Sequence, residues 1–318
     1  MRLKGLCPSA PSGPHPRIFR TQRNAVCSLL AALCLGSPAM AETIGWSVAI
    51  SNDSIGEARD RWQSSSVQVG IARGRGWDGQ MPDRVGEVLE FRFRSDILTP
   101  EVLDAPAPGD RRHAGVLAIG LHSHFARSAW EARLGADVVV VGPQTGLLSF
   151  QEQLHEALGF TVPRLDDYQI EDQVGLDLSG EVGRALPVGA GVLRPFVEAQ
   201  VGSEDLLRVG LDLSFGALAS GNLMTRAVTT GHRLPMTFEG GEGMSWTLGV
   251  DTAWVEDSIY LPEALGYDLT PTRTRVRAGG LYRWRTLDVF YGLAWLSEEF
   301  EAQPEGQFVG TFQARIDF

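Results

Sequence analysis

From residue 43 onward, apolar and polar side chains alternate with a period of two over segments of about ten residues. Successive side chains of a strand point to opposite faces, so this period predicts strands that separate an apolar from a polar environment. In the last segment one face is apolar or small and the other is polar, formed respectively by Phe308, Gly310, Phe312, Ala314, Ile316 and Phe318, and by Thr311, Gln313, Arg315 and Asp317. We therefore expect an all-β chain.

The polar faces of these segments decide between two architectures. A soluble β-sandwich turns its charged face to water, whereas a transmembrane barrel turns its apolar face to lipid and its polar face to the lumen. Aromatic residues near the segment ends and charges of both signs on the polar faces favour the barrel. We predict a closed antiparallel transmembrane β-barrel of about twelve strands, at residues 43–51, 63–73, 86–97, 113–125, 129–141, 170–183, 190–203, 205–217, 243–256, 271–284, 286–297 and 307–318.

The first 41 residues have the three parts of an export signal. Arg17, Arg20 and Arg23 precede a short apolar stretch at residues 25–35, and an Ala-x-Ala sequence ending at Ala41 gives a cleavage site. The apolar stretch is much shorter than the roughly 20 residues of a transmembrane helix. We therefore expect a signal peptide at residues 1–41 and an outer-membrane β-barrel domain, monomeric, at residues 42–318.

The composition excludes several classes of function. All three cysteines and the only lysine lie within the first 41 residues, so the exported chain has no disulfide, no thiolate nucleophile and no cysteine-ligated zinc. The whole sequence carries 39 Asp and Glu against 28 Lys and Arg. Because nucleic-acid binding needs clustered positive charge, we expect no nucleic-acid partner.

One segment, residues 149–159, has helical rather than strand spacing. Its apolar residues recur at Phe150, Leu154 and Leu158. Gly159 is suited to end a helix, and Gln151 and His155, four residues apart, project from one helix face. A helix between two barrel strands must lie in a loop, and the long loops of such barrels are extracellular. We expect one short helix in an extracellular loop.

Histidine is the main candidate for acid–base chemistry, because the sequence has no HExxH, GxSxG, P-loop or GxGxxG motif. His155 is either a surface residue of the helix or a catalytic base. His122 and His124 could hold a metal from one strand face, or they could face the barrel lumen. Asn52 and Asp53 follow the first strand, where such residues commonly form a turn. From these residues alone the prediction is an exported β-barrel with no assigned activity.

Several short motifs resemble, in order and spacing, the family of outer-membrane lipid A 3'-O-deacylases. The matching pieces are Ser51-Asn52-Asp53, Asp60-Arg61-Trp62-Gln63-Ser64, Leu98-Thr99-Pro100, residues 109–115, Leu134-Gly135 through Gly142-Pro143, Gln151-x3-His155-x3-Gly159, and Gln169. They span roughly residues 46–178. The second half of the chain is similar only in its strand rhythm and its terminal Phe318.

The resemblance implies an outer-membrane esterase that hydrolyses an acyl ester of lipid A, with the 3'-linked acyloxyacyl group as the expected target. It implies a catalytic site of Asn52, Asp53, Ser64 and His155, in which His155 is the general base that deprotonates water. The family is calcium-dependent, and Asp53 and Ser64 are the expected oxygen ligands of a calcium ion that stabilises the oxyanion. Gln151 is expected to orient the imidazole or the substrate.

Arginine is the expected ligand of the lipid A phosphates, because the exported chain has no lysine and a guanidinium matches phosphate oxygens bidentately. Arg111 and Arg112, before the fourth strand, are the candidates. The alternative for these residues is an ion pair with Asp110 or a simple surface charge. The expected partners are thus the lipopolysaccharide of the outer leaflet and the surrounding membrane lipid.

The chain departs from the family pattern after the histidine. Thr161 stands where a family member has a glutamate calcium ligand, and Pro163 stands where it has a tyrosine. Leu165-Asp166 replaces a common Gly-Trp. A calcium site would then need a substitute carboxylate from Asp166 or Asp167.

Two classes of function therefore remain at the level of sequence. In the first, the chain is an active esterase. In the second, it is a catalytically inactive structural barrel or a pore that has kept the scaffold. The esterase requires Asn52, Asp53, Ser64 and His155 to lie in one hydrogen-bonded cluster, and this requirement separates the two.

Overall fold

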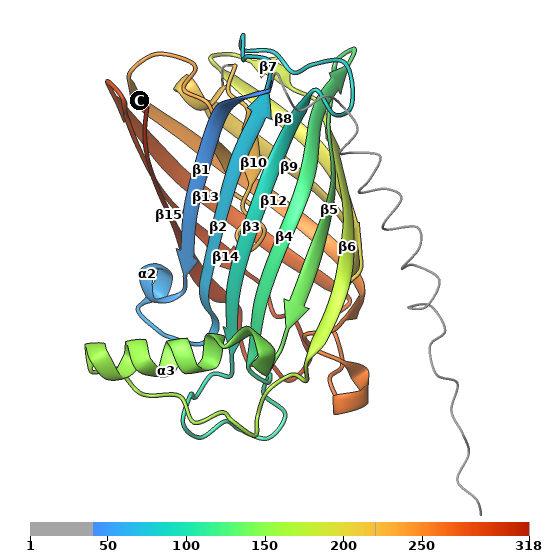
Figure 1. The fold of residues 1–318 in the computed structure, drawn as a ribbon, viewed down its shortest axis with the longest axis vertical. Helices are drawn as coiled ribbons and strands as arrows, with labels where there is room; N and C mark the ends of the chain where they lie inside the picture. Colours follow the sequence, from blue (N-terminus) through green and yellow to red (C-terminus); the bar gives the residue numbers. More distant parts are fainter. Residues whose placement is uncertain (1–40, 220, 318) are drawn as a thin grey trace, which may run out of the picture. The chain divides into compact units, whose positions relative to one another are not determined.

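The computed structural model describes residues 41–219 and 221–317, so residues 1–40 of the expected signal peptide and the terminal Phe318 lie outside the described residues. Within them, twelve long strands form one antiparallel sheet that closes into a barrel (Figure 1). The strands are β1 (Glu42–Asn52), β2 (Trp62–Gly74), β3 (Val88–Thr99), β4 (Ala114–Arg127), β5 (Trp130–Val141), β6 (Gln173–Gly183), β8 (Gly191–Val201), β9 (Glu204–Phe215), β12 (Gly243–Ser258), β13 (Thr272–Trp284), β14 (Leu287–Leu296) and β15 (Gln307–Ile316).

The order of strands around the barrel follows the chain. Neighbours in sequence are neighbours in the sheet, β15 returns to pair with β1, and β9 pairs directly with β12. The ring closes between β6 and β8, and the short β7 (Leu186–Val188) extends β8 at their turn. The predicted closed barrel of about twelve strands is confirmed.

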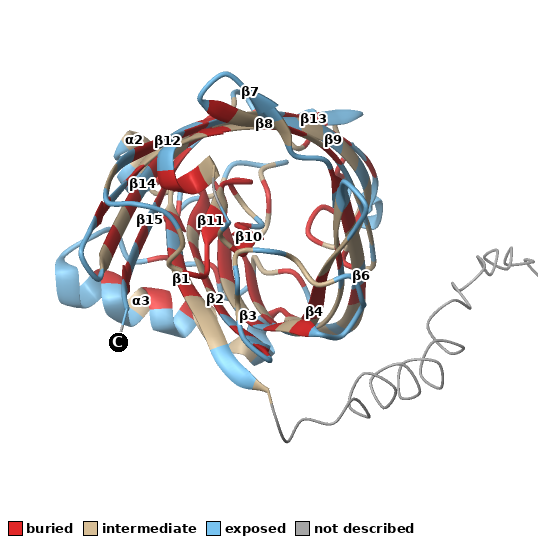
Figure 2. Cartoon of the chain, turned by 90° about the horizontal axis from the view of Figure 1, so that it is seen from above, coloured by how far each residue is buried: buried red, intermediate tan, exposed pale blue. Residues whose placement is uncertain are grey.

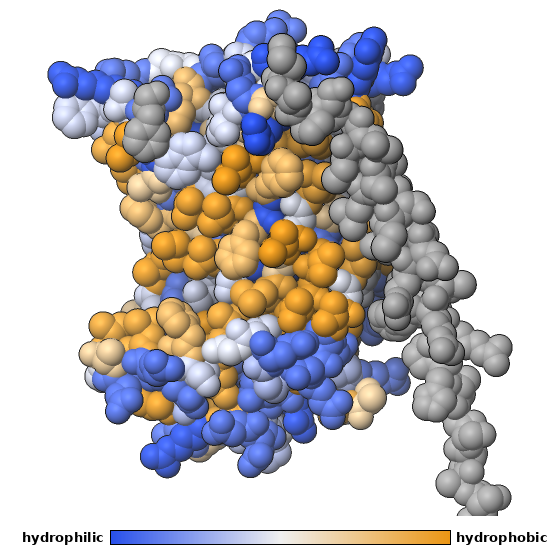
Figure 3. Space-filling view, in the orientation of Figure 1, coloured by the Kyte–Doolittle hydropathy of each residue, from blue (hydrophilic) through white to orange (hydrophobic). Residues whose placement is uncertain are grey.

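The outward face of the barrel is apolar, as a lipid-facing surface must be (Figure 3). Exposed aromatic side chains lie near both ends, with Trp130, Trp246 and Trp284 at the end of the short turns and Trp254 and Phe308 at the opposite end. These positions match the aromatic girdles of a membrane barrel. None of the described helices is long and apolar enough to cross a membrane.

The inward face carries buried charges that pair with one another. Asp251 on β12 accepts hydrogen bonds from Arg208 on β9 (2.5 Å), from Arg275 on β13 (2.9 Å) and from Arg277. His122 and His124 also face the lumen, where they contact Asp137 (3.1 Å) and Glu90 (2.7 Å). Opposite charges at hydrogen-bonding distance offset the cost of burying each one.

A segment between β9 and β12 folds back into the lumen. It contains the one-turn helix η3 (Gly216–Ala219) and the two-stranded hairpin of β10 (Met224–Arg226) and β11 (Arg233–Pro235). Figure 2 shows both hairpin strands inside the ring of barrel strands. Arg226 joins the hairpin to the wall through Glu181 (2.7 Å) and Asp212 (2.8 Å). The barrel is therefore plugged by its own chain.

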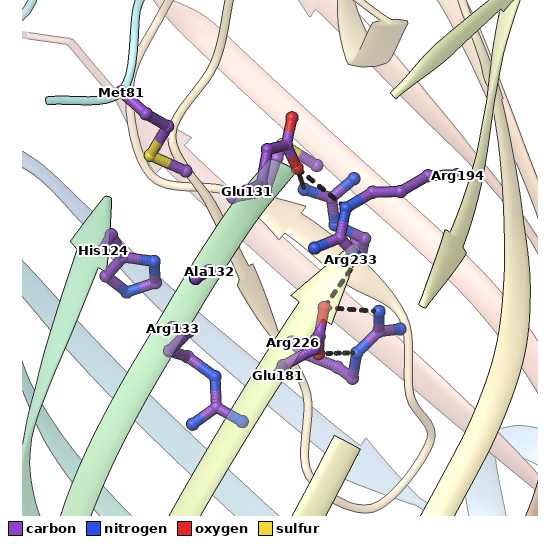
Figure 4. Close-up of a pocket in the computed structure, with 10 residues that line it drawn as sticks. Met81, His124, Glu131, Ala132, Arg133, Glu181, Arg194, Arg226 and Arg233 are labelled. Atoms are coloured by element: carbon purple, nitrogen blue, oxygen red, sulfur yellow. Dashed lines mark hydrogen bonds and ion pairs between the residues drawn. The ribbon is translucent and has the colours of Figure 1, made fainter. Parts of the chain in front are cut away.

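Three spaces inside the barrel are small. Two cavities of about 110 and 80 Å³ lie on the side of the long loops, and a space of about 20 Å³ lies between the hairpin and the wall. Figure 4 shows this smallest space, where Arg194, Arg226 and Arg233 are paired with Glu131 and Glu181. Its size and its paired charges leave no room for a lipid chain.

At the end of the barrel opposite the short turns, the loops are longer and contain the other described helices. They are α2 (Ser54–Glu57), η2 (Pro143–Thr145), α3 (Leu147–Leu158) and η4 (Glu263–Leu265). Long loops of outer-membrane barrels face the outside of the cell, so this is the extracellular end. The predicted helix over residues 149–159 corresponds to α3, which ends at Gly159 in the left-handed conformation (φ 72°).

Candidate active site

The first part of the site is the connection between β1 and β2 at the extracellular end. Its helix α2 packs on the outside of β15, with the Ile55 carbonyl accepting a hydrogen bond from the Tyr291 hydroxyl (2.8 Å). Two glycines allow this approach: a Cβ on Gly310 would lie 2.6 Å from the Ile55 carbonyl oxygen, and a Cβ on Gly56 would clash with the Phe308 carbonyl. Asn52 and Asp53 are thereby held at the outer rim of the barrel wall.

Ser64 lies beside this connection because β2 begins irregularly. Trp62, fully buried, has a positive φ of 50°, and the register between β2 and β3 shifts between Gln63 and Ser65. A shift of one residue in a strand changes the face to which a side chain points. The Asn52 side-chain amide donates to the Ser64 carbonyl, and the Asn52 Oδ1 accepts from the Ser54 N–H (2.5 Å).

The helix α3 covers this rim from outside the barrel. Gly115 on β4 permits the contact, since a Cβ there would lie 3.0 Å from the Leu147 Cβ at the start of α3. Three side chains of the helix are buried toward the barrel, Leu148, Gln151 and His155. Their spacing of three and four residues puts them on one face, so Gln151 and His155 point into the gap between helix and wall.

A chain of polar contacts links the helix to the rim. The Gln151 amide donates to the Ser64 hydroxyl (2.9 Å), and this hydroxyl donates to Asp60 Oδ1. The other oxygen of Asp60 lies 3.2 Å from His155 Nε2, and His155 Nδ1 lies 2.7 Å from the Thr161 carbonyl oxygen. Together with the bond from Asn52 to Ser64, these contacts join four of the sequence-predicted residues in one cluster.

The contacts fix the roles of the two imidazole nitrogens. A carbonyl oxygen only accepts hydrogen bonds, so Nδ1 carries a proton and donates it to Thr161. In the neutral ring Nε2 is then the basic nitrogen, and it faces a carboxylate that stabilises the positive charge after proton uptake. Phe160 packs edge-on against the ring, with centroids 5.8 Å apart, and limits its rotation. This geometry suits general-base chemistry at Nε2.

Asp53 is fully buried next to this cluster. Its Oδ2 accepts a hydrogen bond from the Arg61 backbone N–H (2.5 Å), and its Oδ1 has no hydrogen bond to any described residue. Burial, with the neighbouring charges of Asp60 and Glu57, raises the pKa of Asp53 to about 8. The guanidinium of Arg61 does not neutralise Asp53, because it pairs with Glu57 (2.8 Å) instead.

These features fit a hard cation. A buried carboxylate oxygen without a partner, close to two further carboxylates, lacks only a positive charge to hold it ionised. Calcium also takes backbone carbonyls and water as ligands, so one carboxylate can suffice as an anchor. The described residues contain no group of three or more His, Asp or Glu arranged to hold a metal. The Ser64 hydroxyl, the other expected ligand, is already engaged with Asp60 and Gln151.

The two arginines expected to bind phosphates lie in different environments. Arg111 is buried and forms an ion pair with Glu299 (2.6 Å) rather than with Asp110, so its guanidinium is turned inward and away from the membrane surface. Arg112 lies nearer the surface, with its guanidinium 5.1 Å from the Tyr168 ring and 3.4 Å from the Gln169 carbonyl oxygen. Of the pair, Arg112 is the one whose position suits an external phosphate.

The region after His155 contributes a backbone carbonyl group to the site, and no carboxylate. Thr161, which stands in place of a glutamate, holds the imidazole through its carbonyl oxygen. Asp166 and Asp167, the expected substitutes, are exposed on the loop, and no contact links either to Asp53.

One residue of the cluster, Asp60, was not predicted as a functional residue. It lies between the Ser64 hydroxyl and the His155 ring and so connects the two sides of the site. The signal was present in the sequence, because Asp60 begins the motif that resembles the deacylase family. Its role could not be inferred from spacing, since the approach of α3 to β2 brings together residues nearly 90 positions apart.

The fold and these contacts define a class: a plugged transmembrane β-barrel with a buried histidine–carboxylate–hydroxyl cluster between its extracellular rim and a loop helix. The chain belongs to the family described as outer membrane protein LpxR, which matches residues 26–318. It is therefore an outer-membrane β-barrel, as predicted, and the resemblance to the lipid A deacylase family is confirmed. This family is calcium-dependent in general.

One solved structure agrees with this fold. LpxR from Salmonella typhimurium is similar with a TM-score of 0.71 at 20% sequence identity, over 86% of this chain and 100% of the other. The β domain of the Bordetella autotransporter BrkA follows with a TM-score of 0.43 at 11% identity, over 88% of this chain and 100% of the other, too low to add to the argument. No curated protein matches the chain in sequence.

Proposed function

We propose that this protein is an outer-membrane esterase that removes an ester-linked acyl chain from lipid A, with the 3'-linked acyloxyacyl group as its target. The observation that carries the proposal is the cluster of Asn52, Ser64, Gln151 and His155 at the extracellular rim, joined through Asp60. Lipid A lies in the outer leaflet, at the level of this rim. Membership of the LpxR family supports the same substrate.

In the proposed mechanism, His155 Nε2 takes a proton from a water molecule, and the resulting hydroxide attacks the ester carbonyl carbon. The hydrogen bond from Nδ1 to Thr161 keeps the ring oriented, and Asp60 stabilises the imidazolium. When the tetrahedral intermediate collapses, Nε2 returns the proton to the sugar alkoxide. The products are the acyloxyacyl acid, which keeps its secondary acyl chain, and the 3'-hydroxyl of the lipid A sugar.

Gln151 and Asn52 are positioning residues in this scheme. Gln151 holds the Ser64 hydroxyl, which in turn holds Asp60 against the histidine. Asn52 fixes the backbone of Ser64. A calcium ion bound at Asp53 would polarise the ester carbonyl and stabilise the negative charge that develops on its oxygen.

Mass spectrometry of lipid A tests the proposal. Expression of the protein in a bacterial host without such an esterase should convert lipid A to a species lighter by one acyloxyacyl group. The matched control is Gln153→Ala, an exposed position of α3 that makes no contact with the cluster, which should behave as the unaltered protein. Lipid A of unchanged mass, with the barrel folded in the outer membrane, would contradict the proposal.

A further inference from the structure

The helix α3 has three faces, and the proposed function uses only one of them. Its buried face holds Leu148, Gln151 and His155 against the barrel rim. A second face is apolar, and about half of its side-chain surface is exposed. Its side chains are Phe150, Leu154 and Leu158, which are 57%, 43% and 56% exposed. Residues four apart follow one side of a helix, so these three form a continuous apolar stripe.

The apolar surface continues beyond the helix. Phe160 and Val162 in the following segment are 60% and 38% exposed, and Ile55 of α2 is 42% exposed. Contiguous apolar patches of this kind are rare on water-exposed surfaces, because each exposed apolar side chain leaves favourable transfer free energy unused. The extracellular helices therefore present a surface that needs an apolar neighbour.

This surface is continuous with the lipid-facing belt of the barrel. Ile50, exposed on the outer part of β1, lies beside the connection that carries α2. In Figure 3 apolar side chains pass without a break from the barrel wall onto the projecting part at the lower left, where Figure 1 shows α3. Hydrophilic side chains cover the opposite, extracellular side of that part.

The third face of α3 is polar. Glu152, Gln153 and Glu156 lie on it, and no lysine or arginine occurs in the helix. Attraction to anionic lipid headgroups therefore cannot hold α3 at the membrane, and burial of apolar side chains must do so. The separation of apolar and acidic faces is that of a helix lying in the plane of a membrane interface.

We infer that α3 and the segment after it are inserted in the outer leaflet, with the stripe of Phe150, Leu154 and Leu158 buried among the acyl chains of the surrounding lipid. This deepens the proposed function, since it places His155, on the adjacent helix face, at the depth where ester-linked acyl chains begin. The insertion itself rests on the apolar surface and is independent of hydrolysis.

Cysteine labelling measures the depth of α3 directly, because residues 42–318 contain no cysteine. The single-cysteine variants Leu154→Cys and Glu156→Cys, two residues apart on different faces, are labelled with a small fluorophore. Each is reconstituted in phosphatidylcholine nanodiscs with brominated or unbrominated acyl chains. Gel mobility before and after heating verifies that both barrels are folded.

Brominated chains should quench the label at position 154 several-fold more than the label at position 156, and aqueous iodide should show the reverse order. Equal iodide quenching at the two positions would overturn the insertion. The same measurement on a His155→Ala background should give the same result. The quenching measurement thus distinguishes failure of the insertion from failure of the proposed hydrolysis.

Discussion

The imidazole of His155 is held between a carbonyl oxygen and a carboxylate, and it is buried rather than a surface group. In the proposed function this ring is the general base. Replacement by alanine should lower ester hydrolysis by about 10²–10⁴-fold, the usual loss for a general base. The readout is the fraction of lipid A deacylated, with heat-dependent gel mobility verifying the barrel. Deacylation at the normal rate in His155→Ala would mean that α3 only covers the site.

Asp53 gives a prediction about metal removal. Its buried Oδ1 without a partner is the expected anchor of the cation, so a chelator should stop hydrolysis and lower the thermal midpoint of unfolding. In Asp53→Asn the carboxylate is lost, and the chelator should no longer change the midpoint. Calorimetry with and without added calcium measures both. A variant that is stabilised by calcium as strongly as the unaltered protein would exclude Asp53 as the anchor.

His113, just before β4, gives a prediction about pH. Burial lowers the pKa of its imidazole from 6.5 to about 4, so the folded state binds fewer protons than the unfolded state between these values. The stability contribution is therefore full above pH 6.5 and is lost as the pH falls toward 4. In His113→Gln the loss between pH 7 and pH 5 should be smaller by about 2 kcal/mol. Equal pH dependence of unfolding in detergent would contradict this.

At the residue scale, the sequence predicts which candidate residues lie close together locally, but not their long-range contacts. His155 and Gln151 could be placed on one helix face, and Asn52, Asp53 and Ser64 beside one turn, because these relations are local. The ion pair of Arg111 with Glu299 could not be predicted, since the two residues meet only after β14 and β15 close the barrel. The sequence motif indicated a phosphate ligand, whereas tertiary packing gave Arg111 an internal partner.

At the element scale, the packing of α2 on β15 positions Asn52 and Asp53. Gly310→Ala should displace α2, because the new Cβ would lie 2.6 Å from the Ile55 carbonyl oxygen. We expect at least a tenfold loss of hydrolysis with an intact barrel, measured on purified protein. The matched control is Gly175→Ala on β6, where a Cβ meets nothing within 4 Å. Equal activity in both variants would show that α2 does not position the site.

The strands could be predicted because a membrane barrel imposes one simple rule on every residue, outward or inward. All twelve predicted segments are strands within a few residues of the expected bounds. The stripe of Phe150, Leu154 and Leu158 predicted α3 but not its orientation. In a water-soluble protein this stripe would face the core, whereas here the polar Gln151 and His155 face the barrel and the stripe remains exposed.

At the scale of the whole molecule, the charges of the lumen and the returning segment act together. The hairpin of β10 and β11 was not predicted, because its strands have three residues each and show no measurable alternation. Arg226 in β10 completes ion pairs with wall residues of β6 and β9. A lumen lined by unpaired acids would be costly, so the segment both fills the barrel and balances its charge.

The blocking of the lumen by this segment distinguishes an esterase from a pore. Because β9 and β12 are neighbours in the sheet, a short Gly-Ser turn can replace residues 219–241 without changing the order of the strands. In planar lipid bilayers the unaltered protein should show no stable conductance, and the shortened variant should show open channels. Arg226→Ala should keep the lumen closed but lower the free energy of unfolding, by about 3 kcal/mol, since it leaves buried carboxylates with fewer partners. Stable open channels in the unaltered protein, as large as those of the shortened one, would mean that the hairpin does not seal the barrel, and the pore would then be the better interpretation of the fold.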